Sequence, residues 1–227
     1  MILAEEAGTL EDQVDYYAQG VHAGERALGS ECFAQNVGHF WGITATRPYM
    51  RARFGLAESL TALGRTDEAI EHYQELLRLN PNDNQGVRYV LMPKLLATGR
   101  DVEAARLLKS SDEESANWAY ARALLAFRLS GRSAAASREL RQAIRVNPHV
   151  PELLCSDKPL PHPRPYSPGS FEEAVNCAVE MQGTFQATVG ALDWVADEQR
   201  RRDQELDRQR RERRRKEHAK QKKRKRK

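Results

Sequence analysis

The spacing of apolar residues predicts α-helices over most of the chain. Between about residues 50 and 150, apolar side chains recur every three or four positions, which is typical of helices with one buried face. Glycine readily takes the left-handed conformation that ends a helix, and proline cannot continue a helix. The apolar runs are interrupted by such residues at Gly64, Gly99, Gly131, Asn80-Pro81 and Asn147-Pro148. The pattern therefore predicts pairs of helices joined by tight turns.

Three segments repeat this arrangement with a period of about 34 residues. They cover residues 50–83, 85–116 and 117–150. When the first segment is aligned with the third, Gly64 corresponds to Gly131 and Pro81 corresponds to Pro148. A helix pair of this length exposes an apolar stripe that it cannot cover alone, so neighbouring pairs are expected to stack.

The repeat resembles the tetratricopeptide repeat, most closely over residues 50–83. Ala57 and Ala69 supply the small residues that the family has where the two helices cross, Tyr73 supplies its bulky residue, and Pro81 closes the repeat. Arg53 departs from the pattern, which has an aromatic residue there. Residues 38–42 and 46–52 also resemble stretches of uncharacterised bacterial repeat proteins. The resemblance implies an all-α, right-handed α-solenoid of stacked helix-turn-helix repeats.

The predicted organisation has five parts. It comprises an N-terminal helical region with a partial repeat (1–49), three repeats (50–148), a Pro-rich strap (149–170), capping helices (171–198) and a basic tail (199–227). Residues 9–21 match the second helix of a repeat. Either the array begins with a half repeat or the chain belongs to something longer upstream, and we favour the longer chain.

Proline and glycine shape the predicted C-terminal half. Seven of the ten prolines lie between residues 148 and 168, which predicts an extended strap without regular helix. Its apolar residues favour docking on the repeats over a free linker; they are Leu153, Leu154, Leu160 and Tyr166. After the strap, the helical period returns at Phe171. We expect the capping helices to be broken near Gly183 or Gly190.

Charge is divided sharply along the chain. The total is 36 basic and 32 acidic residues, yet residues 200–227 hold 17 Lys or Arg against 5 Asp or Glu, a net +12 that leaves −8 for the remainder. The i,i+4 pairs Asp207–Arg211 and Glu212–Lys216 favour a solvated helix at the start of the tail. The final residues, 221–227, repel one another and are predicted to be disordered.

Several classes of function lack a sequence basis. There is no GxGxxG, P-loop, GxSxG or HExxH motif, so we predict no enzymatic activity, no cofactor and no metal. His72 with Glu75 is predicted to be a solvated surface pair, and residues 39–41 are predicted to pack between helical units. No apolar run approaches the length of a membrane span or a secretory signal, and three dispersed cysteines fit a reducing cytoplasm.

The family resemblance implies a concave groove lined by the first helix of each pair. The groove positions are Arg51, Phe54, Glu58, Tyr89, Pro93, Leu96, Trp118, Arg122, Leu125 and Arg128. Aromatic and arginine side chains are frequent anchors of interfaces, so a non-enzymatic adaptor that binds a peptide or helix is the first hypothesis. In the competing interpretation, Trp118 and Phe54 pack against the strap or the next helix. Binding of chaperone tails is not predicted, because Glu58 replaces the asparagine of that family pattern.

The basic tail supports an alternative function. Its cations are suited to nonspecific binding of nucleic acid or another anionic surface; they are Arg213, Arg214, Arg215, Lys216, Lys222, Lys223, Arg224, Lys225, Arg226 and Lys227. No aromatic residues are interleaved with them, so base specificity is not expected. Two other interpretations stay open: the tail lies against the acidic body and masks the groove, or it is a solvated tail without a function.

Overall fold

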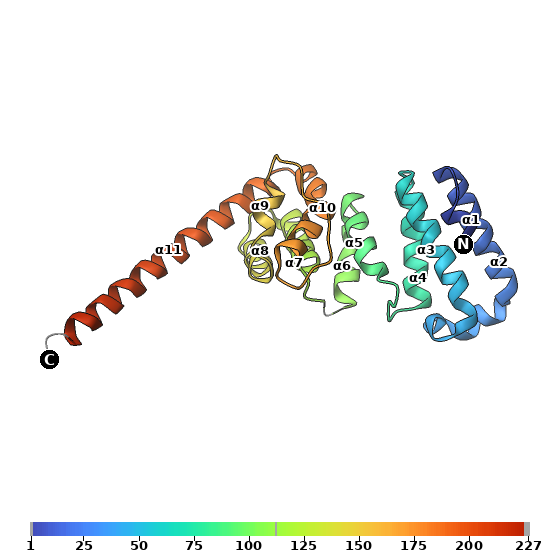
Figure 1. Ribbon diagram of the computed structural model, residues 1–227, viewed down its shortest axis with the longest axis horizontal. Coiled ribbons are helices and arrows are strands. Elements are labelled where there is room, and N and C mark those ends of the chain that lie inside the picture. Colours follow the sequence, from blue (N-terminus) through green and yellow to red (C-terminus); the bar gives the residue numbers. More distant parts are fainter. Residues whose placement is uncertain (1, 112, 225–227) are drawn as a thin grey trace. The chain divides into compact units, whose positions relative to one another are not determined.

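The computed structural model describes residues 2–111 and 113–224, and the side chains of residues 3–111 and 113–217. The described chain consists of helices, turns and loops without a strand, which confirms the predicted all-α class (Figure 1). Two compact units are present, Met1–Leu107 (unit 1) and Leu108–Lys227 (unit 2). The boundary falls inside the second predicted repeat.

Unit 1 contains the N-terminal helices and the closest copy of the repeat. Its elements are α1 (Ile2–Glu5), α2 (Leu10–Asn36), the 3₁₀ turns η1 (Phe40–Gly42) and η2 (Thr44–Thr46), α3 (Arg47–Ala62), α4 (Thr66–Leu79), α5 (Val87–Ala97) and most of α6 (Asp101–Lys109), which ends just past the boundary. Pro48 lies in the first turn of α3, where no backbone N–H is needed. The Asp83 carboxylate accepts hydrogen bonds from the Val87 and Arg88 backbone N–H groups (2.7 and 3.0 Å), so this residue caps α5.

Close helix crossings organise the core of unit 1. α3 packs against both α2 and α4. Ala57 and Ala69 are fully buried on α3 and α4, and Tyr73 beside them is also fully buried, as the repeat pattern predicts. A Cβ added to Gly24 of α2 would lie 2.9 Å from the Tyr49 ring of α3, too close for an unshifted contact. The absence of a side chain at Gly24 therefore permits the approach of α2 to α3.

Phe40 and Trp41 of the cluster at residues 39–41 pack as predicted, while His39 is exposed. Phe40 is fully buried, and its ring centre lies 5.0 Å from that of Phe33 and 6.2 Å from that of Tyr49. Trp41 receives the guanidinium groups of Arg47 and Arg51 over its ring, at 5.6 and 5.9 Å from the ring centre. These contacts hold η1 against α2 and α3.

Unit 2 contains the third repeat, the strap and the C-terminal helices. Its elements are α7 (Ala116–Ser130), α8 (Ala134–Val146), α9 (Val150–Leu154), α10 (Phe171–Ala187) and α11 (Ala191–Arg224). The predicted strap was wrong at its start, since residues 150–154 are helical. Pro151 occupies the first turn of α9, where proline is tolerated. The break between the capping helices lies at Gly190, and α10 runs through Gly183 without interruption.

The rest of the strap, residues 155–170, is not helical and lies along α10. Gln182 of α10 donates hydrogen bonds to the carbonyl oxygens of Leu153 (3.1 Å) and Ser156 (3.0 Å). Asn176 pairs with the Arg164 backbone, accepting from its N–H (3.3 Å) and donating to its oxygen (3.1 Å). Polar side chains of α10 therefore help to fix the course of residues 155–170, where Leu160 is half-buried and Tyr166 is exposed. Of the predicted docking residues, Leu153 and Leu154 are buried, and both belong to α9.

A buried carboxylate joins the distant parts of unit 2. Glu173, 3% exposed, accepts hydrogen bonds from the backbone N–H of Ala116 (3.0 Å) and of Gly169 (2.6 Å). It also accepts from Asn147 Nδ2 (3.0 Å), and the same nitrogen donates to the Ser170 oxygen (2.8 Å). Glu173 thus connects the start of α7, the end of α8 and the end of the strap to α10.

The last helix is anchored in unit 2 by its first two turns. Trp194 is buried and stacks on Phe127 with ring centres 4.6 Å apart. Glu198, 2% exposed, pairs with Arg141 (3.4 Å) and Arg201 (3.1 Å). Beyond Glu198 the helix continues to Arg224.

Candidate functional site

A hollow of about 520 Å³ lies on one side of α3 in unit 1. Phe54 and Glu58, two of the predicted groove residues, line it together with neighbours that sequence reasoning missed. The other lining residues are Glu5, Gln13, Tyr17, Gly55, Ser59 and Ala62. The hollow is therefore built from α1, α2 and α3, and it combines two aromatic rings with two carboxylates.

Neighbouring contacts fix the orientation of the two predicted residues. The half-buried Phe54 ring meets the Tyr73 ring edge-on at 5.9 Å, and the exposed Glu58 carboxylate accepts a hydrogen bond from the Tyr73 hydroxyl. Opposite them, Tyr17 contacts the face of Gly55, where any Cβ would collide with its ring. Burial, followed by the nearby charge of Glu5, raises the pKa of Tyr17. A glycine within a predicted helix is the sequence signal for this close approach.

The other predicted groove residues of unit 1 divide into exposed and buried. Arg51 is exposed beside Trp41, and Tyr89 is 41% exposed on α5. Pro93 and Leu96 are buried, so their assignment to an open groove was wrong. Both are among the buried residues of α5, most of whose apolar side chains join the helical core. The second repeat has fewer residues that match the family pattern, so its groove positions were less well determined from the sequence.

The predicted groove residues of α7 do not form an open surface. Trp118 is fully buried, and its proposed role as a peptide anchor is corrected. Arg122, Leu125 and Arg128 are half-buried. Arg128 donates to the Thr188 hydroxyl (3.1 Å) at the end of α10, and α10 packs along α7. In unit 2, therefore, α10 packs on the face of α7 that the family resemblance assigns to a groove.

The predicted cations of the tail lie on or beyond α11. Arg213, Arg214, Arg215 and Lys216 are exposed and helical. Lys222, Lys223 and Arg224 are also helical, which corrects the predicted disorder for residues 221–224, while Lys225, Arg226 and Lys227 lie outside the described residues. Extending an existing helix costs far less than nucleating one. The observed side-chain pairs are Arg210–Asp207 (3.9 Å) and Arg213–Glu217 (3.2 Å), not the predicted i,i+4 pairs.

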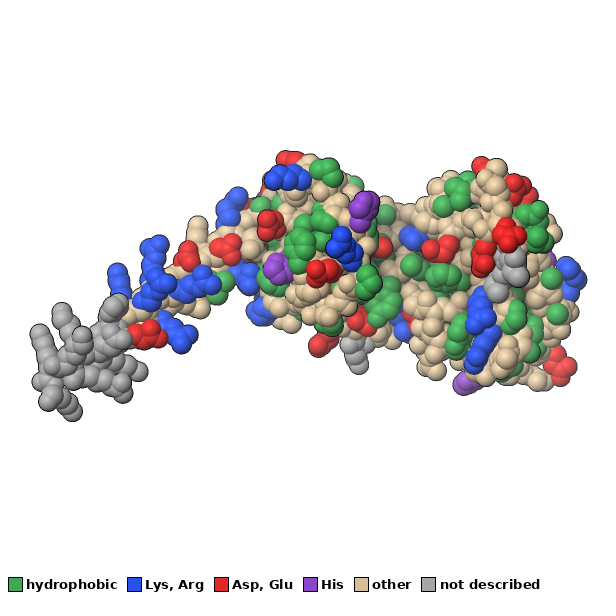
Figure 2. Space-filling view, in the orientation of Figure 1, with side chains coloured by type: hydrophobic (Ala, Val, Ile, Leu, Met, Phe, Trp, Pro, Cys, Tyr) green, Lys and Arg blue, Asp and Glu red, His purple; other side chains and the backbone are tan. Residues whose placement is uncertain are grey.

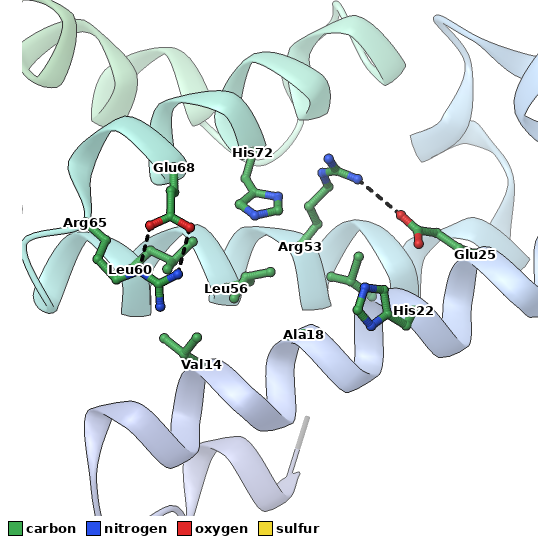
Figure 3. Close-up of a pocket in the computed structure, with 11 residues that line it drawn as sticks. Val14, Ala18, His22, Glu25, Arg53, Leu56, Leu60, Arg65, Glu68 and His72 are labelled. Atoms are coloured by element: carbon green, nitrogen blue, oxygen red, sulfur yellow. Dashed lines mark hydrogen bonds and ion pairs between the residues drawn. The ribbon is translucent and has the colours of Figure 1, made fainter.

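A second hollow, of about 260 Å³, lies on the opposite side of α3 (Figure 3). Here α2, α3 and α4 bring together Arg53, His72, His22 and Glu25 over an apolar floor, with Arg65 and Glu68 at one end. The prediction for His72 was wrong. Its ring is half-buried and faces this hollow, and Glu75 pairs with Arg78 (2.6 Å) instead. Burial, followed by the charge of Arg53, lowers the pKa of His72 to about 4.

This low pKa predicts a loss of stability in mild acid. Between pH 6.5 and about 4 the unfolded chain protonates His72 while the folded chain does not, so the free energy of unfolding falls as the pH falls. Because the ring is partly solvated, we expect His72→Gln to reduce the loss between pH 7 and pH 4.5 by about 1 kcal/mol. Urea titrations at both pH values measure it. His39→Gln, at an exposed histidine, is the control. If the free energy of unfolding fell equally in the two variants between pH 7 and pH 4.5, the prediction would be contradicted.

The fold and these surfaces define a protein built of stacked helix pairs, and comparison with known proteins identifies the repeat. A family model described as "Tetratricopeptide repeat" matches residues 60–126, and the chain therefore carries tetratricopeptide repeats. A solved structure titled "MamA MSR-1 C2" is 14% identical, with a TM-score of 0.42; the match covers 83% of this chain and 98% of that one. No curated protein matches the chain.

Two further properties concern the described residues alone. None of their helices combines the length and the apolar character needed to cross a bilayer. Their His, Cys, Asp and Glu side chains form no group of three or more that could hold a metal ion. The repeats are of a kind that serves protein–protein interaction, so the chain is an interaction module in this general sense.

Proposed function

We propose that this protein is a non-enzymatic, cytoplasmic adaptor that binds a peptide or helix of a partner protein in the hollow lined by Phe54 and Glu58. The observation that carries the proposal is that residues of α1, α2 and α3 line one open hollow, in which Phe54 and Glu58 belong to the repeat at residues 50–83. Aromatic side chains supply much of the binding energy of interfaces. Phe54 and Tyr17 are placed to supply it here.

The charge of the hollow indicates the chemistry of the partner segment. Glu5 and Glu58 are both exposed at its edges, and Tyr17 adds a neutral phenol, whose pKa is raised further by burial. A segment with a Lys or Arg beside an apolar residue complements this combination of carboxylates and rings. Complementary charge favours both the rate and the specificity of association.

Selection of peptides on the full chain tests this function. We expect enrichment of segments with a basic residue next to an apolar one, and an about 30-fold loss of their affinity in Phe54→Ala, the effect of removing an aromatic anchor. Glu5→Lys is expected to weaken the same peptides without altering the core, because Glu5 is exposed. Leu129→Ala is the control, since this leucine of α7 is 89% exposed. Failure to enrich any segment, or equal binding by all variants, would exclude this hollow.

A second candidate function rests on α11. Its exposed cations include Arg213, Arg214 and Arg215, and Leu206 is the one large apolar side chain between Glu198 and Glu217. Lys and Arg side chains stand out along the visible face of this helix (Figure 2). Such a helix has no apolar seam for a coiled coil, and its charge suits a phosphate backbone. We infer that nonspecific nucleic-acid binding by this helix is the alternative to a purely protein-binding role.

A further inference from the structure

The hollow on the opposite side of α3 holds two buried nitrogen atoms that lack a partner among the described residues. They are Arg53 Nε and His72 Nδ1, and both residues line the same hollow (Figure 3). Buried polar atoms in folded proteins are almost always hydrogen-bonded, and leaving one unpaired is costly. Two such atoms on residues that line one hollow therefore point to a group that binds beside them and accepts hydrogen bonds after a small shift of the side chains.

The surrounding ion pairs show which arginine of the hollow can bind an added anion. Arg65 holds Glu68 through two hydrogen bonds of 2.7 Å, so its charge is already matched. Arg53 has its nearest carboxylate, on Glu25, at 3.7 Å, beyond hydrogen-bond distance. The Glu25 side chain is 44% exposed and the Arg53 side chain only 16% exposed, so Glu25 has room to move away while Arg53 stays in place. Nη1 of Arg53 also donates to the Tyr49 hydroxyl, which fixes its guanidinium group.

The rest of the lining is apolar. Val14, Val21, Leu56 and Leu60 are largely buried, and they form the floor of the hollow between α2 and α3. A ligand that satisfies both regions has an anionic oxygen group at one end and a short hydrocarbon stem at the other. Inorganic oxyanions lack the stem, and neutral amides lack the charge that a buried guanidinium group favours.

We propose that this hollow is a binding site for a carboxylate carried on a short apolar stem, held by Arg53 Nε and by His72 Nδ1 when that nitrogen carries its proton. The site is distinct from the partner-binding hollow, because Arg53, Leu56 and Leu60 point to one side of α3 while Phe54 and Glu58 line the other. The bound carboxylate takes the place of Glu25 beside Arg53. The stem is either that of a free small acid or that of the C-terminal residue of a protein.

Titration of the full chain with butyrate tests the site, followed through the imidazole NMR signals of His72. We expect a saturable shift with butyrate and much weaker effects with inorganic phosphate or the neutral analogue butyramide. Arg53→Lys keeps the charge but removes Nε, and it is expected to weaken butyrate binding about tenfold or more, the effect of losing a charge-assisted hydrogen bond. Arg78→Gln, at an exposed arginine of α4 outside the hollow, is the control.

Glu25→Gln keeps the test decisive if Arg53→Lys fails to fold. This variant removes the carboxylate that competes for Arg53, so butyrate is expected to bind several-fold more tightly, and misfolding does not produce tighter binding. Equal affinity for butyrate and butyramide, no gain in Glu25→Gln or no saturable shift at all would each overturn the proposal. With binding established, a peptide ending in an apolar residue and its amidated form separate the two sources of the carboxylate: a free-terminus preference identifies a protein terminus, and binding of butyrate alone identifies a small acid.

Discussion

Replacement of Glu173 with Ala is expected to lower the free energy of unfolding by about 3 kcal/mol or more, since three donors lose their shared acceptor. The donors are the backbone N–H groups of Ala116 and Gly169 and the side-chain amide of Asn147. Asn147 keeps its hydrogen bond to the Ser170 oxygen, while the other two N–H groups lose the bond to Glu173. Urea titration of the full chain, followed by circular dichroism, measures the change.

Glu172→Ala is the matched control for this experiment. Glu172 also lies in the first turn of α10 but is exposed, so it shares the favourable position near the helix N-terminus without the buried contacts. We expect its loss to be below about 1 kcal/mol. Glu173→Gln keeps the shape and one oxygen acceptor, and it is expected to fall between the two. If Glu173→Ala were no less stable than Glu172→Ala, the prediction would be wrong, because water would then accept the hydrogen bonds that Glu173 accepts.

The second large effect concerns salt. If α11 contacts about six phosphates, the affinity of the full chain for duplex nucleic acid is expected to fall by about a thousandfold between roughly 50 and 200 mM salt. Replacement of Arg213, Arg214 and Arg215 with Gln removes three of the contacts. The slope of log affinity against log salt is then expected to become shallower by about three. Fluorescence anisotropy at a series of salt concentrations measures both quantities.

A variant with the same change in charge elsewhere provides the control. Arg106, Arg138 and Lys158 are exposed and lie outside α11. Their replacement with Gln alters the net charge equally, and we expect it to leave the slope nearly unchanged. A slope that falls equally in both variants would mean that net charge, not the basic helix, attracts the nucleic acid. Absence of binding at low salt would remove the alternative function altogether.

Local sequence signals predicted the helices of this protein well. Gly64, Gly99 and Gly131 end the first helices of their pairs with positive φ angles, and α4 and α8 stop before Asn80 and Asn147. These features depend on the backbone preferences of single residues and their neighbours. Phe54 and Glu58, which the family resemblance assigned to a groove, line one hollow.

Features that depend on partners distant in sequence were missed. Glu173 meets Ala116 across 57 positions, and no local pattern distinguishes it from the exposed Glu172 beside it. Trp118 was assigned to a groove because the family resemblance places its helical face there. The sequence did not show that α10 packs along α7, and Trp118 is buried. His72 was expected to be solvated because the sequence does not show that Arg53 and α2 border its ring.

The unbroken course of α11 has a consequence for the electrostatics of its cations. From Glu198, which is fixed in unit 2, to Arg224 the helix advances about 1.5 Å per residue, or about 40 Å in all. The screening length at physiological ionic strength is only about 8 Å. The electrostatic attraction between the cations at the far end and the acidic residues at the base of the same helix is therefore screened out. Because the helix is unbroken, it does not fold back to bring the two groups together. An anion that reaches the far end of α11 is therefore attracted by the charge of that end of the helix, with little opposing effect from the acidic residues at its base.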